Sequence, residues 1–215
     1  SEKIQNVNKD VDPIRDIEII ETEILLSDLE SLQKRLEKSN KKKLNKEELN
    51  FLGESLKLIS IGKKPDELKK KYSKDLIKKS ALLSLKPRII VCNVDEKSLP
   101  GGNKYSDACK KKFSGENIII VCADIEDQIM SLQTADRKDF MLESGIKSTG
   151  LDNLIKTGYS TLGLSTFFTS GPEESRAWTI EKNSKAADAA GIIHTDFKKK
   201  FIRAETVSHE DFIKY

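Results

Sequence analysis

Apolar residues recur at helical spacing over the first third of the chain, from about Ile19 onward. One set runs from Leu25 to Leu36 in steps of four, three and four residues, which places its members on one helix face. A second set runs from Leu49 to Ile59, and a third, shorter stretch extends from Leu68 to near Leu83. The pattern predicts a helical hairpin with coiled-coil-like packing over residues 21–85, followed within that range by a shorter returning helix.

Two short and almost wholly apolar runs follow the helical region. They are Arg88–Cys92 and Asn117–Cys122, and residues 104–112 between them are a candidate helix. Runs without alternation are typical of parallel strands that are buried on both faces. Strand, helix and strand over about this length predict a right-handed crossover unit. Helices are expected further along, over residues 124–144 and 151–162.

The last part of the chain has a different pattern, with short strands and little helix. Residues 165–169 and 177–180 are predicted to form two paired strands, and residues 185–190 a short helix. Residues 202–207 alternate between apolar and polar positions, which predicts a further strand. Residues 164–215 are therefore expected to form a small α+β module.

Composition narrows the class of protein. Apolar residues make up 37% and charged residues 34% of the 215 positions, and the formal net charge is only +3. Any affinity for nucleic acid must therefore come from local basic patches. No apolar stretch approaches the roughly 20 residues that span a bilayer, so no membrane partner is expected. Three cysteines, two of them within apolar runs, suit a reducing compartment and predict a cytoplasmic protein.

The candidate chemistry lies directly after the two predicted strands. Asn93, Val94 and Glu96 follow the first strand, and the second ends at Cys122 and Ala123. Ligands of open α/β sheets bind at the carboxyl ends of strands. An Asn amide can donate to and accept from a base edge, and a carboxylate can accept from a purine N–H group. Taken alone, a tetrapeptide of the form Asn-x-x-Glu, here Asn93 to Glu96, is more often a solvated loop. The two predicted strands beside it favour a nucleotide-base site instead.

Two basic clusters are candidate contacts for RNA phosphates. The first lies at the predicted tip of the helical hairpin and the second in the C-terminal module. A rigid arm with a basic tip suits RNA, but a solvated face that keeps the arm soluble explains the same residues, and both readings stay open. The residues are Lys34, Arg35, Lys38, Lys41, Lys42 and Lys43 in the first cluster and Lys198, Lys199, Lys200 and Arg203 in the second.

Several segments resemble one known family. KPRIIVCNVDE resembles the fourth guanine-nucleotide-protein motif of the YchF branch of Obg-like NTPases, and VCADIE resembles the fifth. VDPIRDIEIIETEILLSDLESLQKRL resembles the family segment that leads from the nucleotide domain into an inserted helical hairpin. FFTSGPEESRAWTI and KAADAAGIIHTDFKKKFIRAE resemble the start of its C-terminal TGS module. The resemblance covers nearly the whole chain in order.

The resemblance implies a partial α/β P-loop NTPase with a helical coiled-coil hairpin insertion and a partial β-grasp (ubiquitin-like) TGS domain. Residues 1–20 would be a remnant of the nucleotide-binding G domain and residues 21–85 the hairpin. Residues 86–163 would be the second half of the G domain, and residues 164–215 a truncated TGS domain. The resemblance also implies hydrolysis of ATP, or possible use of GTP, with Mg²⁺, and a ribosome or ribosomal RNA as partner. A monomer is expected.

By the same resemblance, Asn93 and Glu96 frame the base, Val94 adds a backbone contact, and Cys122 and Ala123 lie beside them. Most related GTPases carry N-K-x-D here, whose Asp accepts two hydrogen bonds from guanine. This chain has Val94 in place of the Lys and the longer Glu96 in place of the Asp. The displaced carboxylate should lose the bidentate fit, which predicts a relaxed preference for guanine.

The family's phosphate-binding motif, G-x-x-x-x-G-K-[ST], does not occur in these 215 residues. That motif supplies the N–H groups for the β-phosphate and the hydroxyl for Mg²⁺, so we expect this chain by itself to be inactive, without catalytic residues or metal ligands. Two other functions compete with a nucleotide hydrolase. One is a non-enzymatic RNA-binding module, and the other is a coiled-coil adaptor that binds protein.

Overall fold

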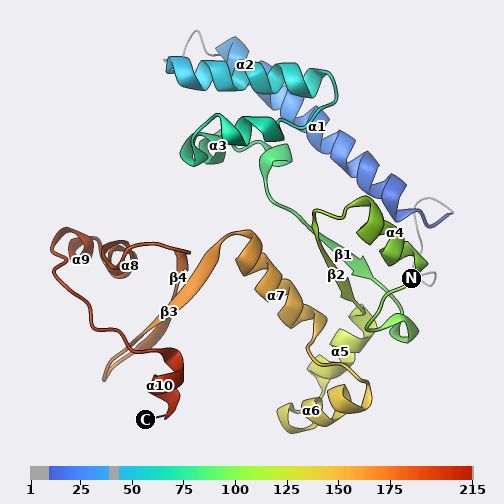
Figure 1. Ribbon diagram of the computed structural model, residues 1–215, viewed down its shortest axis with the longest axis vertical. Coiled ribbons are helices and arrows are strands. Elements are labelled where there is room, and N and C mark those ends of the chain that lie inside the picture. Colours follow the sequence, from blue (N-terminus) through green and yellow to red (C-terminus); the bar gives the residue numbers. More distant parts are fainter. Residues whose placement is uncertain (1–9, 39–43, 215) are drawn as a thin grey trace. The chain divides into compact units, whose positions relative to one another are not determined.

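The computed structural model describes residues 10–38 and 44–214 (Figure 1). The chain divides into two compact units, Ser1–Asn153 and Leu154–Tyr215. The first, called here the N-terminal unit, contains a set of helices and a parallel sheet with its own helices. The second, the C-terminal unit, contains an antiparallel strand pair and short helices.

The helical arm of the N-terminal unit begins with α1 (Pro13–Glu37) and α2 (Lys46–Ser60). The Asp12 side chain accepts a hydrogen bond from the Arg15 N–H and caps α1, with proline in the first turn, where its fixed φ suits a helix start. The helix therefore starts six residues before Ile19, where the apolar pattern predicts it. It also runs through the expected domain boundary between residues 20 and 21.

The returning part of the arm differs from the single helix that the apolar pattern predicts. It consists of a 3₁₀ turn η2 (Asp66–Lys70), helix α3 (Lys74–Ser80) and a second 3₁₀ turn η3 (Leu83–Leu85). The Ser73 side chain accepts a hydrogen bond from the Leu76 N–H and starts α3 anew. Apolar spacing continues across this break, so periodicity alone could not reveal it.

The arm has its own apolar core, in which Leu32 and Phe51 are fully buried. The Phe51 ring meets the edge of Tyr72 with 5.1 Å between the ring centroids. The predicted leucine face of α1 packs here, because its other members border the same cluster. The buried members of the core are Leu32, Phe51, Leu52, Ile59, Leu68, Leu82 and Leu85.

A buried carboxylate joins the first helix of the arm to the segment that leaves it. Asp28 on α1 is 3% exposed and accepts hydrogen bonds from the backbone N–H groups of Leu83 and Ser84, both at 2.8 Å. It also accepts from the Ser84 hydroxyl at 2.6 Å. A buried carboxylate is stable only when its oxygens are paired in this way. Asp28 thus attaches the chain that leaves the arm to the helix that enters it.

The sheet of the N-terminal unit is a strand–helix–strand unit, as predicted. Strands β1 (Ile89–Asn93) and β2 (Asn117–Val121) pair in parallel, with Ile89 opposite Asn117 and Asn93 opposite Val121. Helix α4 spans Lys104–Lys112, as expected from the sequence, and Asn103 caps it. After β2 come α5 (Ala123–Ser131), α6 (Thr134–Glu143) and α7 (Gly150–Thr161).

The expectation that both strands are buried on both faces is wrong. Ile119 of β2 is 7% exposed, but Val91 of β1 is 44% exposed. Val91 and Asn93, which lie on the same face of β1, are both exposed, so this face is open to solvent in the part of the chain that the structure describes. An apolar run indicates a strand suited to burial, but the neighbouring layers decide whether it is buried.

The C-terminal unit is built on a hairpin of β3 (Leu164–Ser170) and β4 (Ser175–Glu181), which confirms both predicted strands. The indole N–H of Trp178 donates to the Thr169 hydroxyl at 2.9 Å and links the two strands. In the described residues of this unit, three short helices follow the hairpin. They are α8 (Ala186–Ile193), α9 (Thr195–Lys199) and α10 (His209–Lys214).

The strand predicted over residues 202–207 is absent from the described structure. Residues 201–208 have neither helix nor strand, and Ile202 and Val207 are 92% and 64% exposed. Alternation describes only the two faces of a segment. A strand also needs a neighbouring edge that takes its backbone hydrogen bonds, and here the segment pairs with neither β3 nor β4.

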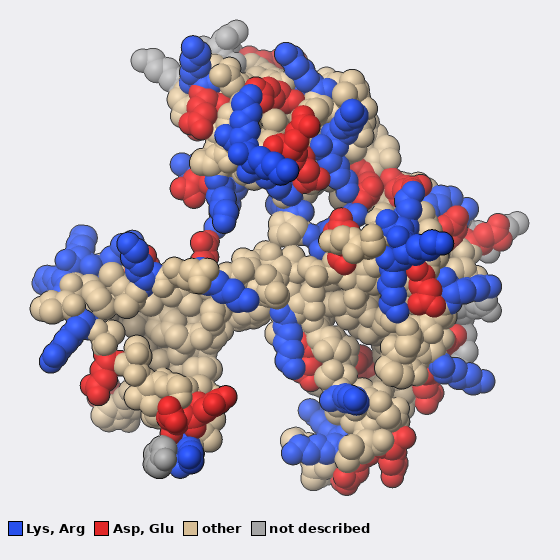
Figure 2. Space-filling model, in the orientation of Figure 1, with Lys and Arg blue, Asp and Glu red and all other residues tan. Residues whose placement is uncertain are grey.

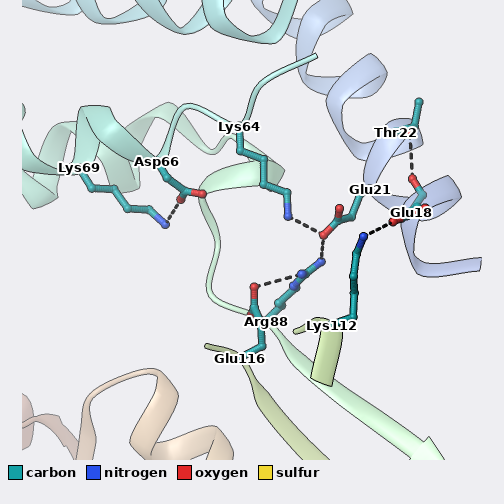
Figure 3. A network of polar contacts seen from close by, with 9 residues as sticks. All are labelled: Glu18, Glu21, Thr22, Lys64, Asp66, Lys69, Arg88, Lys112 and Glu116. Atoms are coloured by element: carbon teal, nitrogen blue, oxygen red, sulfur yellow. Dashed lines mark hydrogen bonds and ion pairs between the residues drawn. The ribbon is translucent and has the colours of Figure 1, made fainter. Parts of the chain in front are cut away.

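Charged side chains attach the arm to the amino ends of the sheet strands (Figure 3). Glu21 of α1 pairs with Lys64 at 2.6 Å and with Arg88, which directly precedes β1. Arg88 also pairs with Glu116, which directly precedes β2, at 3.0 Å. The arm is thus anchored at the opposite ends of the strands from Asn93, which leaves their carboxyl ends clear of this network.

We expect Asp28→Ala to lower the free energy of unfolding by about 2–4 kcal/mol, because three partly buried donors lose their acceptor. Urea denaturation followed by circular dichroism measures the loss. Glu23→Ala, which removes an exposed acid from the same helix, is the control and should change stability by less than about 0.5 kcal/mol. Equal losses in the two variants would contradict the structural role of Asp28.

We expect the contribution of Glu21 to stability to depend on pH. Burial raises the pKa of Glu21, but hydrogen bonds from Lys64 and Arg88 outweigh burial and hold the pKa below its ordinary value of 4.5. A carboxyl group with a lowered folded-state pKa stabilises the fold above its unfolded-state pKa, and this contribution is lost as the pH falls through the folded-state value.

The corresponding variant is Glu21→Gln, measured by urea denaturation from neutral to acid pH. It should be less stable than the wild type at pH 7, and the difference should shrink below pH 4.5. Glu23→Gln is the matched control on the same helix. A stability difference that stays constant over the whole pH range would show that the Glu21 charge does not matter.

Candidate functional site

The two strand ends meet as the sequence predicts. Asn93 and Val121 are opposite each other in the parallel register. Beyond that pair, the Asn93 side-chain oxygen accepts a hydrogen bond from the Ala123 N–H at 3.1 Å. The Val94 N–H donates to the Val121 carbonyl at 2.8 Å. The predicted site residues from both strands are therefore joined by direct hydrogen bonds.

Val94 has a structural part in this arrangement. Its side chain is 4% exposed, and its N–H is engaged by Val121. The backbone contact that the family resemblance implies for Val94 therefore cannot use this N–H group without breaking the bond between the strand ends. Val94 is better described as the residue that holds the two ends together.

Two neighbouring acids at this site have different environments. The Asp95 carboxylate accepts a hydrogen bond from the Ser98 hydroxyl within the turn that follows β1. Glu96 is exposed and begins the 3₁₀ turn η4 (Glu96–Ser98). The fold thus uses Asp95 to shape the turn, while the Glu96 side chain remains at the surface beside the strand ends.

Cys122 and Ala123 also differ from each other. Cys122 is 1% exposed and packs with Ile125 and Ile129 in a small apolar cluster, so its side chain serves the core. Ala123 is exposed and begins α5, and its N–H is the group bound by Asn93. On β1, Cys92 is only partly buried, and burial raises the pKa of its thiol to about 11, so that cysteine remains protonated.

Sequence reasoning missed Glu126 and Gly150. The Glu126 carboxylate accepts hydrogen bonds from the N–H of Gly150 at 2.5 Å and of Leu151 at 3.3 Å, and so caps α7. Gly150 lies against Val121, the last residue of β2. A helix start near residue 150 can be predicted from the local Thr-x-x-Asp pattern. The contact with Glu126 has no sequence signal, because 24 residues separate the partners.

A groove of about 510 Å³ runs along β1, between α1 and α4. Its walls are largely apolar, and they include Asn93 and Val94 at one end. Glu96, Cys122 and Ala123 do not line it. The groove therefore reaches the predicted base site only at Asn93 and Val94, and the other predicted residues, Glu96, Cys122 and Ala123, lie outside it.

The structure places the first basic cluster near the end of α1, partly in intramolecular contacts. Lys34 forms an exposed pair with Glu30 within α1, whereas the Arg35 guanidinium donates to the Ser80 carbonyl and so links α1 to the end of α3. Lys38 is exposed. Figure 2 shows basic and acidic side chains interspersed over the arm on the face drawn. Three further members of the cluster lie outside the described residues: Lys41, Lys42 and Lys43.

The second basic cluster lies at the end of α9 and just beyond it. Lys198 pairs with Asp188 of α8 at 2.7 Å. Lys199, Lys200 and Arg203 are exposed. This cluster therefore offers three exposed cations over a short segment, together with one that is engaged in an ion pair.

Residues 10–38 and 44–214 contain no group of three or more His, Cys, Asp or Glu side chains that could hold a metal ion. None of the helices described there is both long and apolar enough to cross a membrane.

Comparison with known proteins gives consistent results. The family model YchF-GTPase_C, described as a protein of unknown function (DUF933), matches residues 164–215. Proteins named ribosome-binding ATPase YchF match nearly the whole chain, with 42% identity over 224 residues in Bacillus subtilis and 35% over 229 residues in Haemophilus influenzae. The solved Schizosaccharomyces pombe YchF GTPase superposes with a TM-score of 0.79 at 32% identity and covers 99% of this chain. The chain spans 61% of the length of each of these relatives.

We expect Asn93→Ala to speed hydrogen exchange of the Ala123 amide about tenfold, because that amide loses its acceptor. Asn93→Asp keeps an oxygen in the same place and should retain the protection. Exchange measured by NMR checks this, with the Ile119 amide inside β2 as an internal reference. Unchanged protection of Ala123 in the Ala variant would mean that Asn93 does not join the strand ends.

Proposed function

This chain is a homologue of the ribosome-binding ATPases called YchF, and from that relationship we propose that it acts in a ribosome-associated, nucleotide-hydrolysing protein of the Obg-like family. In this proposal residues 86–163 form the base-recognition half of a P-loop nucleotide domain. The arm is the helical hairpin insertion, with coiled-coil packing, and residues 164–215 are the start of a β-grasp TGS domain. The relatives are named as an ATPase or a GTPase, and this favours the proposed function over a non-enzymatic RNA-binding module or an adaptor.

The observation that carries the proposal is the joining of the two strand ends through Asn93 and Ala123. A purine placed there would meet the Asn93 carboxamide, whose oxygen already accepts from the Ala123 N–H, and, beside it, the exposed Glu96 carboxylate. Because Asp95 is engaged by Ser98, Glu96 is the acid of this turn that is available to a base. We assign the base contacts to Asn93 and Glu96, and we assign no phosphate or Mg²⁺ ligand to this chain.

The same geometry bears on the choice between ATP and GTP. Guanine offers two neighbouring N–H groups to a carboxylate, and a short, fixed Asp accepts both best. Glu96 is one methylene longer and lies at the surface, so we propose that it holds guanine less selectively. ATP is then a substrate and GTP a possible second one, with Mg²⁺ as the usual companion of either.

We propose ribosome association because the relatives are named ribosome-binding ATPases. The exposed cations Lys38, Lys199, Lys200 and Arg203 are the described residues of the two basic clusters best able to meet ribosomal RNA phosphates. A protein that works on ribosomes belongs in the cytoplasm, and we propose that it does so as a monomer.

We expect Glu96→Asp in the full-length protein to raise the affinity for GTP relative to ATP by about tenfold, because the shorter acid can accept both guanine N–H groups. Competition of each nucleotide against a fluorescent ATP analogue measures the ratio. Glu173→Asp, the same change in an exposed turn of the C-terminal unit, is the control. An unchanged ratio in Glu96→Asp would remove Glu96 from the base site.

A further inference from the structure

The start of α7 is built into the end of the sheet. Helix α5 begins at Ala123, whose N–H is held by Asn93, and Glu126 lies one turn further on. The Glu126 carboxylate receives the N–H groups of Gly150 and Leu151, which are the first two residues of α7. A continuous series of contacts therefore leads from Asn93 through α5 to the turn that starts α7.

This turn leaves no space for a side chain at residue 150. A Cβ atom added to Gly150 would lie 2.7 Å from Val121 Cγ1 and 2.9 Å from Glu126 Oε1. Contacts under about 3 Å are essentially never seen for a Cβ atom, so a larger residue at position 150 would require Val121, Glu126 or the turn itself to shift. The backbone of Gly150 therefore lies directly against the residue that pairs with Asn93.

The helix itself has a cap that does not need Glu126. The Thr149 hydroxyl oxygen accepts from the Asp152 N–H at 3.0 Å, which is the usual local cap. The Ser148 hydroxyl donates to the Asn153 side-chain oxygen at 3.0 Å within the same turn. Glu126 adds two further capping bonds to this helix start, and because it lies on α5 these bonds also determine where the turn of residues 148–150 lies relative to the strand ends.

We propose that Glu126 is a positioning residue for nucleobase binding, and that Gly150 is its necessary partner. The carboxylate holds the turn of residues 148–150 against Val121, so that the turn forms one side of the place where a purine meets Asn93. This inference rests on the proposed function, because it assigns a wall to the same base site. If the turn moves away, the fraction of molecules ready to bind the base falls, and the apparent affinity falls with it.

The experiment uses the full-length protein and two ligands, ATP and inorganic tripolyphosphate. Tripolyphosphate carries the phosphate chain without a base, so it reports on the rest of the nucleotide site. Binding is measured by competition with a fluorescent ATP analogue, and ATP hydrolysis gives KM and kcat. A general loss of structure would weaken the binding of both ligands. Displacement of the turn of residues 148–150 from the base would weaken the binding of ATP alone.

We expect Glu126→Ala to weaken ATP binding and to raise KM about tenfold, with kcat and tripolyphosphate affinity within about twofold of the wild type. Glu126→Gln keeps the oxygen that receives the Gly150 N–H and should recover most of the affinity. Asp127→Ala, which removes an exposed acid from the next position of α5, should have no effect. Gly150→Ala should reproduce Glu126→Ala from the other side of the contact.

The outcomes separate the two proposals. A full-length wild type that binds no ATP would overturn the proposed function and this inference together. A wild type that binds ATP, with Glu126→Ala and Gly150→Ala equal to Asp127→Ala, would overturn only the inference. Equal weakening of ATP and tripolyphosphate, or no recovery in Glu126→Gln, would reduce Glu126 to a structural residue and reject its role at the base.

Discussion

The parallel pairing of β1 and β2 is the constraint on which the candidate site depends. Asn93 reaches the Ala123 N–H, and Val94 reaches the Val121 carbonyl, because Asn93 and Val121 lie opposite each other at the last position of the ladder. A shift of one residue would turn every side chain of the strand to the other face. Asn93 would then point away from α5, and the two strand ends would no longer be joined.

Strand β1 also has a stabilising polar contact at each of its ends. At its amino end Arg88 attaches the arm through Glu21, and at its carboxyl end Asn93 attaches α5. The five residue steps from Arg88 to Asn93 span roughly 16 Å. Partly exposed ion pairs such as Glu21–Arg88 contribute modestly to stability, whereas the arm's buried core of Leu32, Phe51 and their neighbours contributes much more. The arm is therefore a well-packed body held to the sheet by a weaker polar joint.

The likeness to YchF proteins and the geometry of the strand ends support each other without being the same evidence. The comparisons cover nearly all of this chain, whereas the hydrogen bond between Asn93 and Ala123 is a property of the fold itself. The groove along β1 has a volume of about 510 Å³, yet Glu96, Cys122 and Ala123 do not line it. Polar groups that converge at the strand ends therefore locate the candidate chemistry better than volume does.

Local pattern determined several elements of this protein. The limits of α4, the two apolar strands and the β3–β4 hairpin follow from periodicity, capping and turn residues, which act between near neighbours. The tertiary structure alone decided that residues 202–207 form no strand and that one face of β1 is open. It also decided the contacts of Asp28 with Ser84 and of Glu126 with Gly150. Such pairs join residues 56 and 24 positions apart, and only packing of the whole chain brings them together.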